Sequence, residues 1–305
     1  MTAYLLIAGI DMTKSSELSR RRGRRWWWLV LPVFAVLAIV WAALAGGAAS
    51  KTASPAASTG TASTGTASTG TAGAGRYCRQ LVIPAYFYSS AIWAQAAGSK
   101  PVPSDIILDI SGLGAGNGPQ SHFQALVRQA KAAGATILGY ISTVDGQRPV
   151  AQVETEARNY KAWYGVTSIF LDRVSGQPGQ IAYYRQLVNY IHHFDARSSV
   201  WLNPGDYPDP EYMSIGNVVM VFEGTYAQYV ALQVPSWVGS YPASKFAHTI
   251  YATPSSDLLN ALKLATGRRG GHVYVTDGSG ANPYAGLPSY WSREDSAASA
   301  GCAAG

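Results

Sequence analysis

Charged side chains are scarce in this chain of 305 residues. Asp, Glu, Lys and Arg together make up 13% of the sequence, against roughly 25% in ordinary globular proteins. This scarcity excludes a charge-rich disordered protein, a coiled coil and a strongly basic nucleic-acid-binding protein. The hydrophobic share of 48% is enough for one large domain or two small ones.

Cysteine is nearly absent, and the histidines have no metal-binding pattern. Only Cys78 and Cys302 are present, which excludes a small disulfide-rich fold and a zinc site built from several cysteines. The five histidines show neither HxH nor HExxH spacing, so we expect no metal site. The sequence also lacks a P-loop and a glycine-rich dinucleotide fingerprint, so we expect no cofactor.

The positive net charge of +6 is concentrated at one end of the chain. Residues 1–51 contain seven basic and two acidic side chains, whereas the remainder contains sixteen basic and fifteen acidic ones. The body is therefore nearly neutral, and its high isoelectric point does not indicate binding to nucleic acid.

The amino-terminal segment is typical of export from the cytoplasm. Residues 1–25 are basic, with five arginines between Arg20 and Arg25, and residues 26–45 are apolar throughout. Twenty apolar residues can span a bilayer as a helix, and the arginines would stay on the cytoplasmic side. Because Ala43-Leu44-Ala45 also fits a signal-peptidase site, we expect either a membrane anchor or a secreted protein. In both cases the body is extracellular.

Residues 46–75 predict a disordered linker. From Ala56 to Gly75 the chain repeats a five-residue unit of Ala, Ser, Thr and Gly. These side chains cannot bury a hydrophobic core, so the segment would remain flexible. The linker separates the apolar run from a domain at residues 76–305.

Within residues 76–305, short runs rich in β-branched residues alternate with amphipathic segments. In the segment 180–194, for example, Tyr184, Leu187, Val188 and Ile191 recur at helical spacing. Strands that alternate with helices predict parallel βαβ units, and eight units over this length match a (β/α)8 TIM barrel. A doubly wound sheet is the alternative. The eight predicted strands are Leu81–Phe87, Asp105–Ile110, Thr136–Ile141, Ser168–Asp172, Ser199–Asn203, Val218–Glu223, Ala247–Tyr251 and His272–Asp277.

Polar and aromatic residues stand at the carboxyl ends of these strands, where active sites of such barrels form. Two of them are acids, Asp172 and Glu223. Because side chains alternate along a strand, we expect Phe170 and Asp172 to share one face and Arg173 to take the other. The other residues at or just after the strand ends are Tyr86, Tyr88, Asp109, Tyr140, Asn203, Tyr251 and Asp277.

A pair of carboxylates surrounded by aromatic side chains is typical of glycoside hydrolases. One acid protonates the leaving oxygen, and the other acts as the nucleophile or as the base for water. The alternative is structural, with Asp172 capping the following helix and Glu223 meeting a local arginine. For the pair together, we favour the catalytic interpretation.

Several motifs resemble the spherulation-specific family 4 (spherulin 4-like) proteins, glycoside hydrolase family 135. The matching pieces are Ile83-Pro84-Ala85-Tyr86-Phe87-Tyr88, Gly139-Tyr140-Ile141-Ser142-Thr143, Ile169-Phe170-Leu171-Asp172, Val221-Phe222-Glu223-Gly224, Tyr274-Val275-Thr276-Asp277, Asn282-Pro283-Tyr284 and Leu287-Pro288-Ser289-Tyr290-Trp291.

The resemblance implies a (β/α)8 barrel, endo-hydrolysis of α-1,4-linked N-acetylgalactosamine in galactosaminogalactan, and catalytic roles for Asp172 and Glu223. The expected substrate-binding residues come from the matching motifs and the strand ends: Tyr86, Tyr88, Tyr140, Asn203, Tyr226, Tyr251, Asp277, Tyr284 and Trp291.

One position departs from the family pattern. An acidic residue usually follows the strand-4 aspartate, whereas this chain has Arg173. If Arg173 points away from the site, its charge would lower the pKa of Asp172 and favour the nucleophile or base role there. Glu223 would then be the general acid.

The sequence therefore predicts a glycoside hydrolase, with a polysaccharide and, through the amino-terminal segment, a membrane as its partners. A polysaccharide-binding barrel without activity is the alternative, and a deacetylase is a third, weaker one. We expect a monomer. Cys78 and Cys302 would both lie at the amino-terminal face of the barrel, so a disulfide between them is expected. Two free cysteines remain the other option.

Overall fold

The computed structural model describes residues 79–100 and 103–300, with the side chain of Phe194 left out. The predicted basic segment 1–25, the apolar run 26–45, the linker 46–75, Cys78 and Cys302 lie outside the described residues. Within the described part of the chain, no helix is both long enough and apolar enough to cross a membrane.

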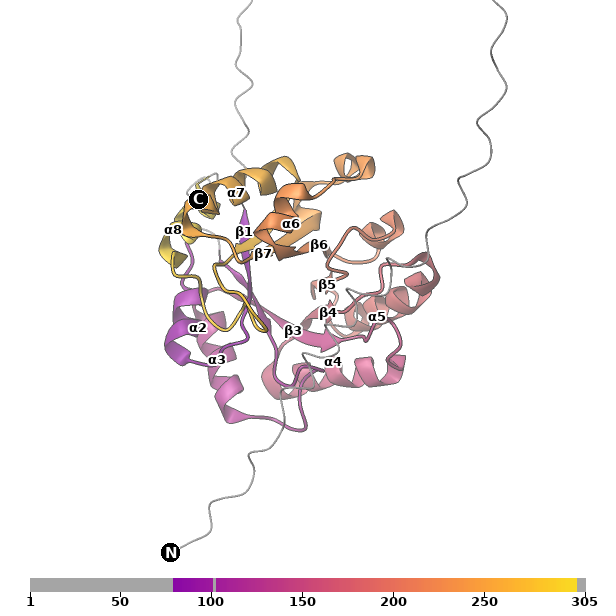
Figure 1. Cartoon of the computed structure of the whole chain (residues 1–305). Coiled ribbons are helices and arrows are strands. Elements are labelled where there is room, and N and C mark those ends of the chain that lie inside the picture. The colour runs from indigo at the N-terminus through magenta and orange to yellow at the C-terminus, as the bar shows by residue number, and fades with distance from the viewer. Residues whose placement is uncertain (1–78, 101–102, 301–305) are drawn as a thin grey trace, which may run out of the picture. The chain divides into compact units, whose positions relative to one another are not determined.

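Eight parallel strands form a closed barrel in which each strand pairs with the next along the chain (Figure 1). The last strand pairs with the first through Gln80–His272 and Leu81–Val273, so the doubly wound alternative is wrong and the predicted TIM barrel is confirmed. The strands are β1 (Gln80–Pro84), β2 (Asp105–Leu108), β3 (Thr136–Ser142), β4 (Ser168–Asp172), β5 (Val200–Leu202), β6 (Val218–Thr225), β7 (Phe246–Tyr251) and β8 (His272–Val275).

Helices follow the strands and cover the outside of the barrel (Figure 1). The apolar spacing in α5 has the expected effect, because Tyr184, Leu187, Val188 and Ile191 are all at most 4% exposed. Gly165 ends α4 in the left-handed conformation, with φ of 63°. The helices are α2 (Ser90–Ala97), α3 (Ser121–Ala132), α4 (Val150–Tyr164), α5 (Ile181–Phe194), α6 (Tyr226–Ala231), α7 (Leu258–Gly267) and α8 (Trp291–Ser299).

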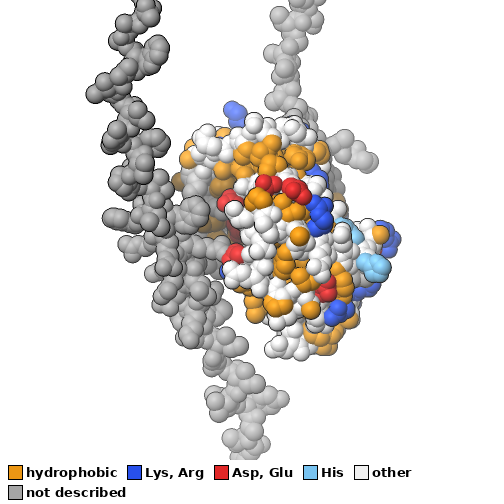
Figure 2. All heavy atoms as spheres, turned by 90° about the vertical axis from the view of Figure 1, so that its right-hand side faces the viewer, with side chains coloured by type: hydrophobic (Ala, Val, Ile, Leu, Met, Phe, Trp, Pro, Cys, Tyr) orange, Lys and Arg blue, Asp and Glu red, His pale blue; other side chains and the backbone are white. Residues whose placement is uncertain are grey.

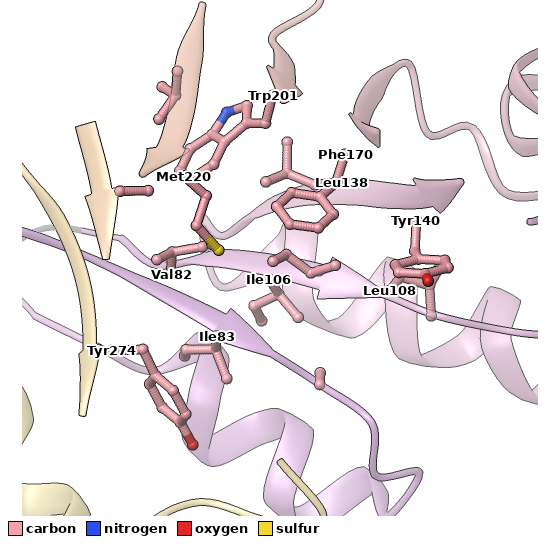
Figure 3. Packing of buried hydrophobic residues seen from close by; sticks show 14 of the residues in the cluster. Val82, Ile83, Ile106, Leu108, Leu138, Tyr140, Phe170, Trp201, Met220 and Tyr274 are labelled. Carbon is pink, nitrogen blue, oxygen red and sulfur yellow. The ribbon is translucent and has the colours of Figure 1, made fainter. Parts of the chain in front are cut away.

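Large apolar side chains fill the barrel between the strands. Leu138, Phe170, Trp201 and Met220 are each at most 2% exposed, and their side chains converge in Figure 3. Tyr140 lies nearer the arrowhead of β3, toward the carboxyl ends of the strands. The core is thus apolar in the middle of the barrel, and polar side chains begin at its carboxyl end.

Charged side chains are few on the face of the molecule that Figure 2 displays. Blue and red side chains are interspersed there, and neither sign gathers into a patch. This face therefore offers no extended basic surface to a phosphate backbone.

Candidate active site

Asn203 joins the two predicted carboxylates. Its side-chain Nδ2 donates a hydrogen bond of 2.7 Å to Asp172 Oδ1 and another of 2.8 Å to Glu223 Oε2. These two carboxylate oxygens are therefore at most 5.5 Å apart. The last residue of β4, the residue after β5 and a residue near the end of β6 thus bring one amide and two acids together.

Each carboxylate also accepts a hydrogen bond from a tyrosine hydroxyl, in addition to the one from Asn203. Tyr140 donates to Asp172 Oδ2 at 2.7 Å, and Tyr284 donates to Glu223 Oε1 at 3.1 Å. The ring of Tyr86 packs edge-to-face against both tyrosines, with centroid separations of 6.1 and 5.8 Å. Tyr86 therefore helps to fix the orientation of both hydroxyl donors.

At the end of β4, the predicted alternation is confirmed. Asp172 faces Tyr140 and Asn203, whereas Arg173 takes a left-handed conformation with φ of 52°. The Arg173 guanidinium forms an ion pair of 2.9 Å with Asp145. Arg173 therefore directs its charge to the loop after β3 and makes no ion pair with Asp172.

An irregularity in β6 turns Glu223 toward the same centre. Met220 pairs with Ala247 and Phe222 with His248, so Val221 has no partner of its own on β7. Such a bulge reverses the side-chain alternation that follows it. As a result Phe222 packs outside against Tyr229 of α6, at 4.7 Å between ring centroids, and the next residue, Glu223, points to Asn203.

The pKa values of both carboxyls are raised. For Asp172 the main cause is desolvation, which exceeds the opposing hydrogen bonds from Tyr140 and Asn203 and the attraction of Arg173. For Glu223 desolvation is again the main cause, followed by repulsion from the Asp172 charge. The predicted effect of Arg173 is present, because its charge lowers the pKa of Asp172. Burial outweighs this effect.

Water still reaches the pair. Glu223 is exposed and Asp172 is half-buried, although protein atoms surround both carboxyls closely enough to raise their pKa values. Burial also raises the pKa values of Tyr86, Tyr140 and Tyr284. These three hydroxyls therefore remain protonated donors at neutral pH.

Asp109 follows β2 and is a third acid near the pair. Its Oδ1 accepts hydrogen bonds from the backbone N–H of Ser111 at 3.1 Å and of Gly112 at 2.7 Å. Burial raises its pKa, and the Asp172 charge contributes in the same direction. The sequence predicted Asp109 as a strand-end residue but assigned it no role.

The other predicted substrate-binding residues lie at varying distances from the carboxylates. Tyr251 packs edge-to-face on Tyr284, at 6.3 Å between centroids. Tyr226 accepts a hydrogen bond of 2.7 Å from Asn260, and Tyr88 is 46% exposed. The substrate contacts of these three tyrosines therefore stay predictions.

Two predicted binding residues are engaged elsewhere in the fold. Both carboxylate oxygens of Asp277 accept hydrogen bonds from Ser289. Trp291 begins α8, is 7% exposed, and lines a pocket of about 480 Å³ with Ile92 and Leu287. The lining of this pocket contains none of the three acids, so the pocket is separate from the carboxylate pair.

The sequence analysis did not predict two features of the site, the bulge in β6 and the position of Thr249. Nothing in the run from Val218 to Glu223 marks the bulge, because the run reads as an unbroken apolar strand. Thr249 was also missed, although its hydroxyl lies 3.3 Å from the Tyr284 hydroxyl and donates to it while Tyr284 donates to Glu223. Thr249 pairs with Glu223 across β6 and β7, so knowledge of the register would have revealed it.

In the part of the chain that the structure describes, no group of three or more His, Cys, Asp or Glu side chains could hold a metal ion. His248 is fully buried, and its Nδ1 lies 2.6 Å from the Tyr229 hydroxyl. His272 lies near Asp105 at the opposite end of the barrel. The chemistry that this arrangement supports is proton transfer and nucleophilic attack by carboxyl groups.

Known proteins share both the sequence pattern and the fold. A family profile described as spherulation-specific family 4 matches residues 80–298. Spherulin-4 of Physarum polycephalum is 32% identical over 233 residues, which cover 72% of this chain and 69% of that protein.

Among solved structures, the crystal structure of Aspergillus clavatus Sph3 in complex with GalNAc is similar, with a TM-score of 0.64 and 21% identity over 73% of this chain and 98% of that chain. The glycoside hydrolase domain of PelA from Pseudomonas aeruginosa matches 69% of this chain and 98% of that chain, with a TM-score of 0.44 and 17% identity. From the profile match and the identity to Spherulin-4, the chain belongs to spherulation-specific family 4.

Proposed function

We propose that this protein is a glycoside hydrolase that cleaves α-1,4-linked N-acetylgalactosamine in an extracellular amino-sugar polysaccharide such as galactosaminogalactan. The observation that carries the proposal is the Asp172–Asn203–Glu223 bridge at the carboxyl end of the barrel. Glycoside hydrolysis requires two carboxyl groups at a fixed separation. The GalNAc bound to the related Sph3 supports an amino sugar as the substrate.

In this proposal Asp172 is the nucleophile and Glu223 is the general acid. Asp172 accepts short hydrogen bonds from both Tyr140 and Asn203, which stabilise its ionised form. Glu223 has longer bonds from Tyr284 and Asn203, and its proton is retained more strongly because the charge of Asp172 repels the ionised form.

The separation of the two acids supports retention of configuration. Carboxyl groups about 5–5.5 Å apart are typical of retaining enzymes, whereas inverting enzymes need roughly 6.5–9.5 Å to admit a water molecule. The two oxygens that Asn203 bridges are at most 5.5 Å apart, which is shorter than the separation that inverting enzymes need.

The proposed reaction has two steps. Glu223 donates its proton to the glycosidic oxygen while an Asp172 oxygen attacks the anomeric carbon, so the chain is cut and a glycosyl ester forms on Asp172. The ionised Glu223 then accepts a proton from water, which attacks the same carbon and releases Asp172 as the free carboxylate. Tyr140 and Asn203 keep Asp172 oriented in both steps.

The aromatic residues and the amino-terminal segment extend this proposal. Tyr86, Tyr251 and Tyr284 would face sugar rings near the carboxylates, since aromatic rings pack on the apolar faces of sugars. The segment 26–45 would anchor the barrel outside the cell or be cleaved on secretion. We propose that the barrel acts as a monomer.

A polysaccharide-binding protein without activity is the second candidate. It is favoured by one feature, the replacement of the acid that usually follows the strand-4 aspartate by Arg173, which is engaged with Asp145. A binder of this kind would use the same aromatic residues and would not depend on the proton of Glu223.

Release of oligosaccharides from α-1,4-linked poly-N-acetylgalactosamine by the full-length chain tests the proposal. Oligosaccharides should appear with the wild type and with Glu154→Gln, a matched change on α4, and their release should fall about 10³-fold with Glu223→Gln. Anomeric analysis of the first product should show the α form. If the wild type binds the polymer and releases nothing, the binding protein replaces the hydrolase.

A further inference from the structure

Asp109 is a carboxylate that the proposed hydrolysis does not use. It stands directly after β2, is half-buried, and interacts electrostatically with Asp172 and with the hydroxyls of Tyr86, Tyr88 and Tyr140. It therefore belongs to the same end of the barrel as the proposed catalytic pair, on the side of β1 and β2.

Backbone N–H groups orient the carboxylate of Asp109. Oδ1 accepts the backbone N–H groups of Ser111 and Gly112, which fix the orientation of the carboxylate. The side chain as a whole is half-buried, so solvent reaches part of this carboxylate. The carboxylate is thus oriented by the protein and accessible to a donor from a ligand.

Tyr88 provides an aromatic surface on the same side of the barrel, because β1 and β2 pair in register as far as Pro84 and Ile107, and Tyr88 and Asp109 follow these strands. The Tyr88 ring is 46% exposed, yet it is held by an edge-to-face contact with Phe123 at 5.3 Å between centroids. His122 Nε2 lies 2.9 Å from the Tyr88 carbonyl oxygen and fixes the backbone as well. An exposed aromatic ring that is held in place in this manner suits a sugar ring or a cation.

The three acidic side chains in this part of the site have no ion-pair partner among the described residues. Among the described residues, no Lys, Arg or His forms an ion pair with Asp109, Asp172 or Glu223. Arg173, which attracts Asp172 electrostatically, is ion-paired with Asp145. A neutral sugar leaves this negative charge as it is, whereas a sugar that carries an ammonium group reduces it.

We infer that Asp109 and Tyr88 form a subsite for a hexosamine unit with a free, protonated amino group. The ammonium would donate to the Asp109 carboxylate while the sugar ring packs on Tyr88. The enzyme would then prefer a polymer in which part of the N-acetyl groups has been removed. This inference rests on the proposed glycoside hydrolase function and adds a substrate preference to it.

The test compares two polymers, fully N-acetylated α-1,4-galactosaminan and a sample of the same length that has been partly de-N-acetylated. The full-length wild type should show a higher kcat/KM on the partly de-N-acetylated polymer. Asp109→Asn keeps the shape but removes the charge, so it should lose about fivefold on that polymer and change little on the fully acetylated one. Added salt should diminish the preference in the wild type.

Controls separate the contribution of each residue. Glu154→Gln removes one negative charge on α4 and should leave the preference intact. Tyr88→Ala should weaken both substrates alike by increasing KM, and Tyr88→Phe should restore them, because the ring supplies the contact.

The outcomes separate this inference from the function on which it rests. Equal cleavage of both polymers by the wild type, or an equal loss on both in Asp109→Asn, overturns the ammonium subsite and leaves the hydrolase standing. If the wild type neither binds nor cleaves either polymer, the proposed function fails and the subsite fails with it.

Discussion

Carboxylates at the two ends of the barrel have different surroundings. At the amino-terminal end, Asp105 Oδ2 lies 3.2 Å from Nδ1 of His272. The His272 ring also packs edge-on against Trp201, with centroids 4.6 Å apart. At the carboxyl end, Asp172 and Glu223 share the neutral amide of Asn203, and no cation is paired with either among the described residues.

This difference distinguishes Asp105, which has a structural role, from Asp172 and Glu223, to which we assign a catalytic role. Asp105 is 4% exposed and lies beside the His272 ring. The carboxyl-end pair repels itself, is reached by water and has raised pKa values. Raised carboxyl pKa values mean that the ionised forms are less favourable in the folded than in the unfolded chain. Ionisation of Asp172 and Glu223 therefore lowers the free energy of unfolding.

Removal of the proposed nucleophile should have the largest effect. Asp172→Ala is expected to lower kcat on the order of 10³-fold or more, because the glycosyl ester can no longer form. Added azide should restore part of the turnover and yield the β-glycosyl azide, as NMR of the product would detect. An α-glycosyl azide would instead assign Asp172 as the acid–base residue.

Removal of the Asn203 side chain should have a smaller effect on turnover and should shift the pH profile of kcat/KM. Asn203→Ala deletes a donor that stabilises both ionised carboxylates, so their pKa values should rise further. Because Asp172 must be ionised to attack, the acidic limb of the pH profile of kcat/KM should move to higher pH. We expect a loss of roughly tenfold to a hundredfold near pH 6. Asn189→Ala, at an exposed position on α5, is the matched control. An unmoved acidic limb would show that Asn203 does not tune the pair.

At the amino-terminal end the expected effect is on stability alone. Asp105→Asn removes the charge beside His272 and should lower the free energy of unfolding by about 2 kcal/mol. Turnover should change less than twofold, since Asp105 begins β2 at the opposite end from Asp109. Denaturant unfolding and product release on the same samples would measure both. A large loss of turnover without loss of stability would remove the distinction between the two ends.

Much of the barrel could be predicted because its signals are local. The alternation of strand-like and helical segments gave all eight strands, and the ends of β4 and β6 gave both acids. Alternation along β4 also predicted that Asp172 and Arg173 diverge, as the ion pair of Arg173 with Asp145 confirms.

The features that escaped prediction depend on pairing between distant segments. The bulge at Val221 becomes visible only in the register of β6 against β7. The net direction of the pKa of Asp172 depends on burial, which outweighs the neighbouring arginine. The contact of Asp105 with His272 exists because the barrel closes and places β2 and β8 on either side of β1.

The most direct measurement is the turnover of Glu223→Gln together with its melting temperature. The pKa of Glu223 is raised above 4.5, so its ionised form destabilises the fold at neutral pH, and this penalty disappears as pH falls through the raised value. The amide removes the penalty and the catalytic proton at once. Turnover should therefore fall about 10³-fold while the melting temperature at pH 7 stays the same or rises. Retained turnover, or a melting temperature several degrees lower, would contradict the assignment of this end of the barrel to catalysis.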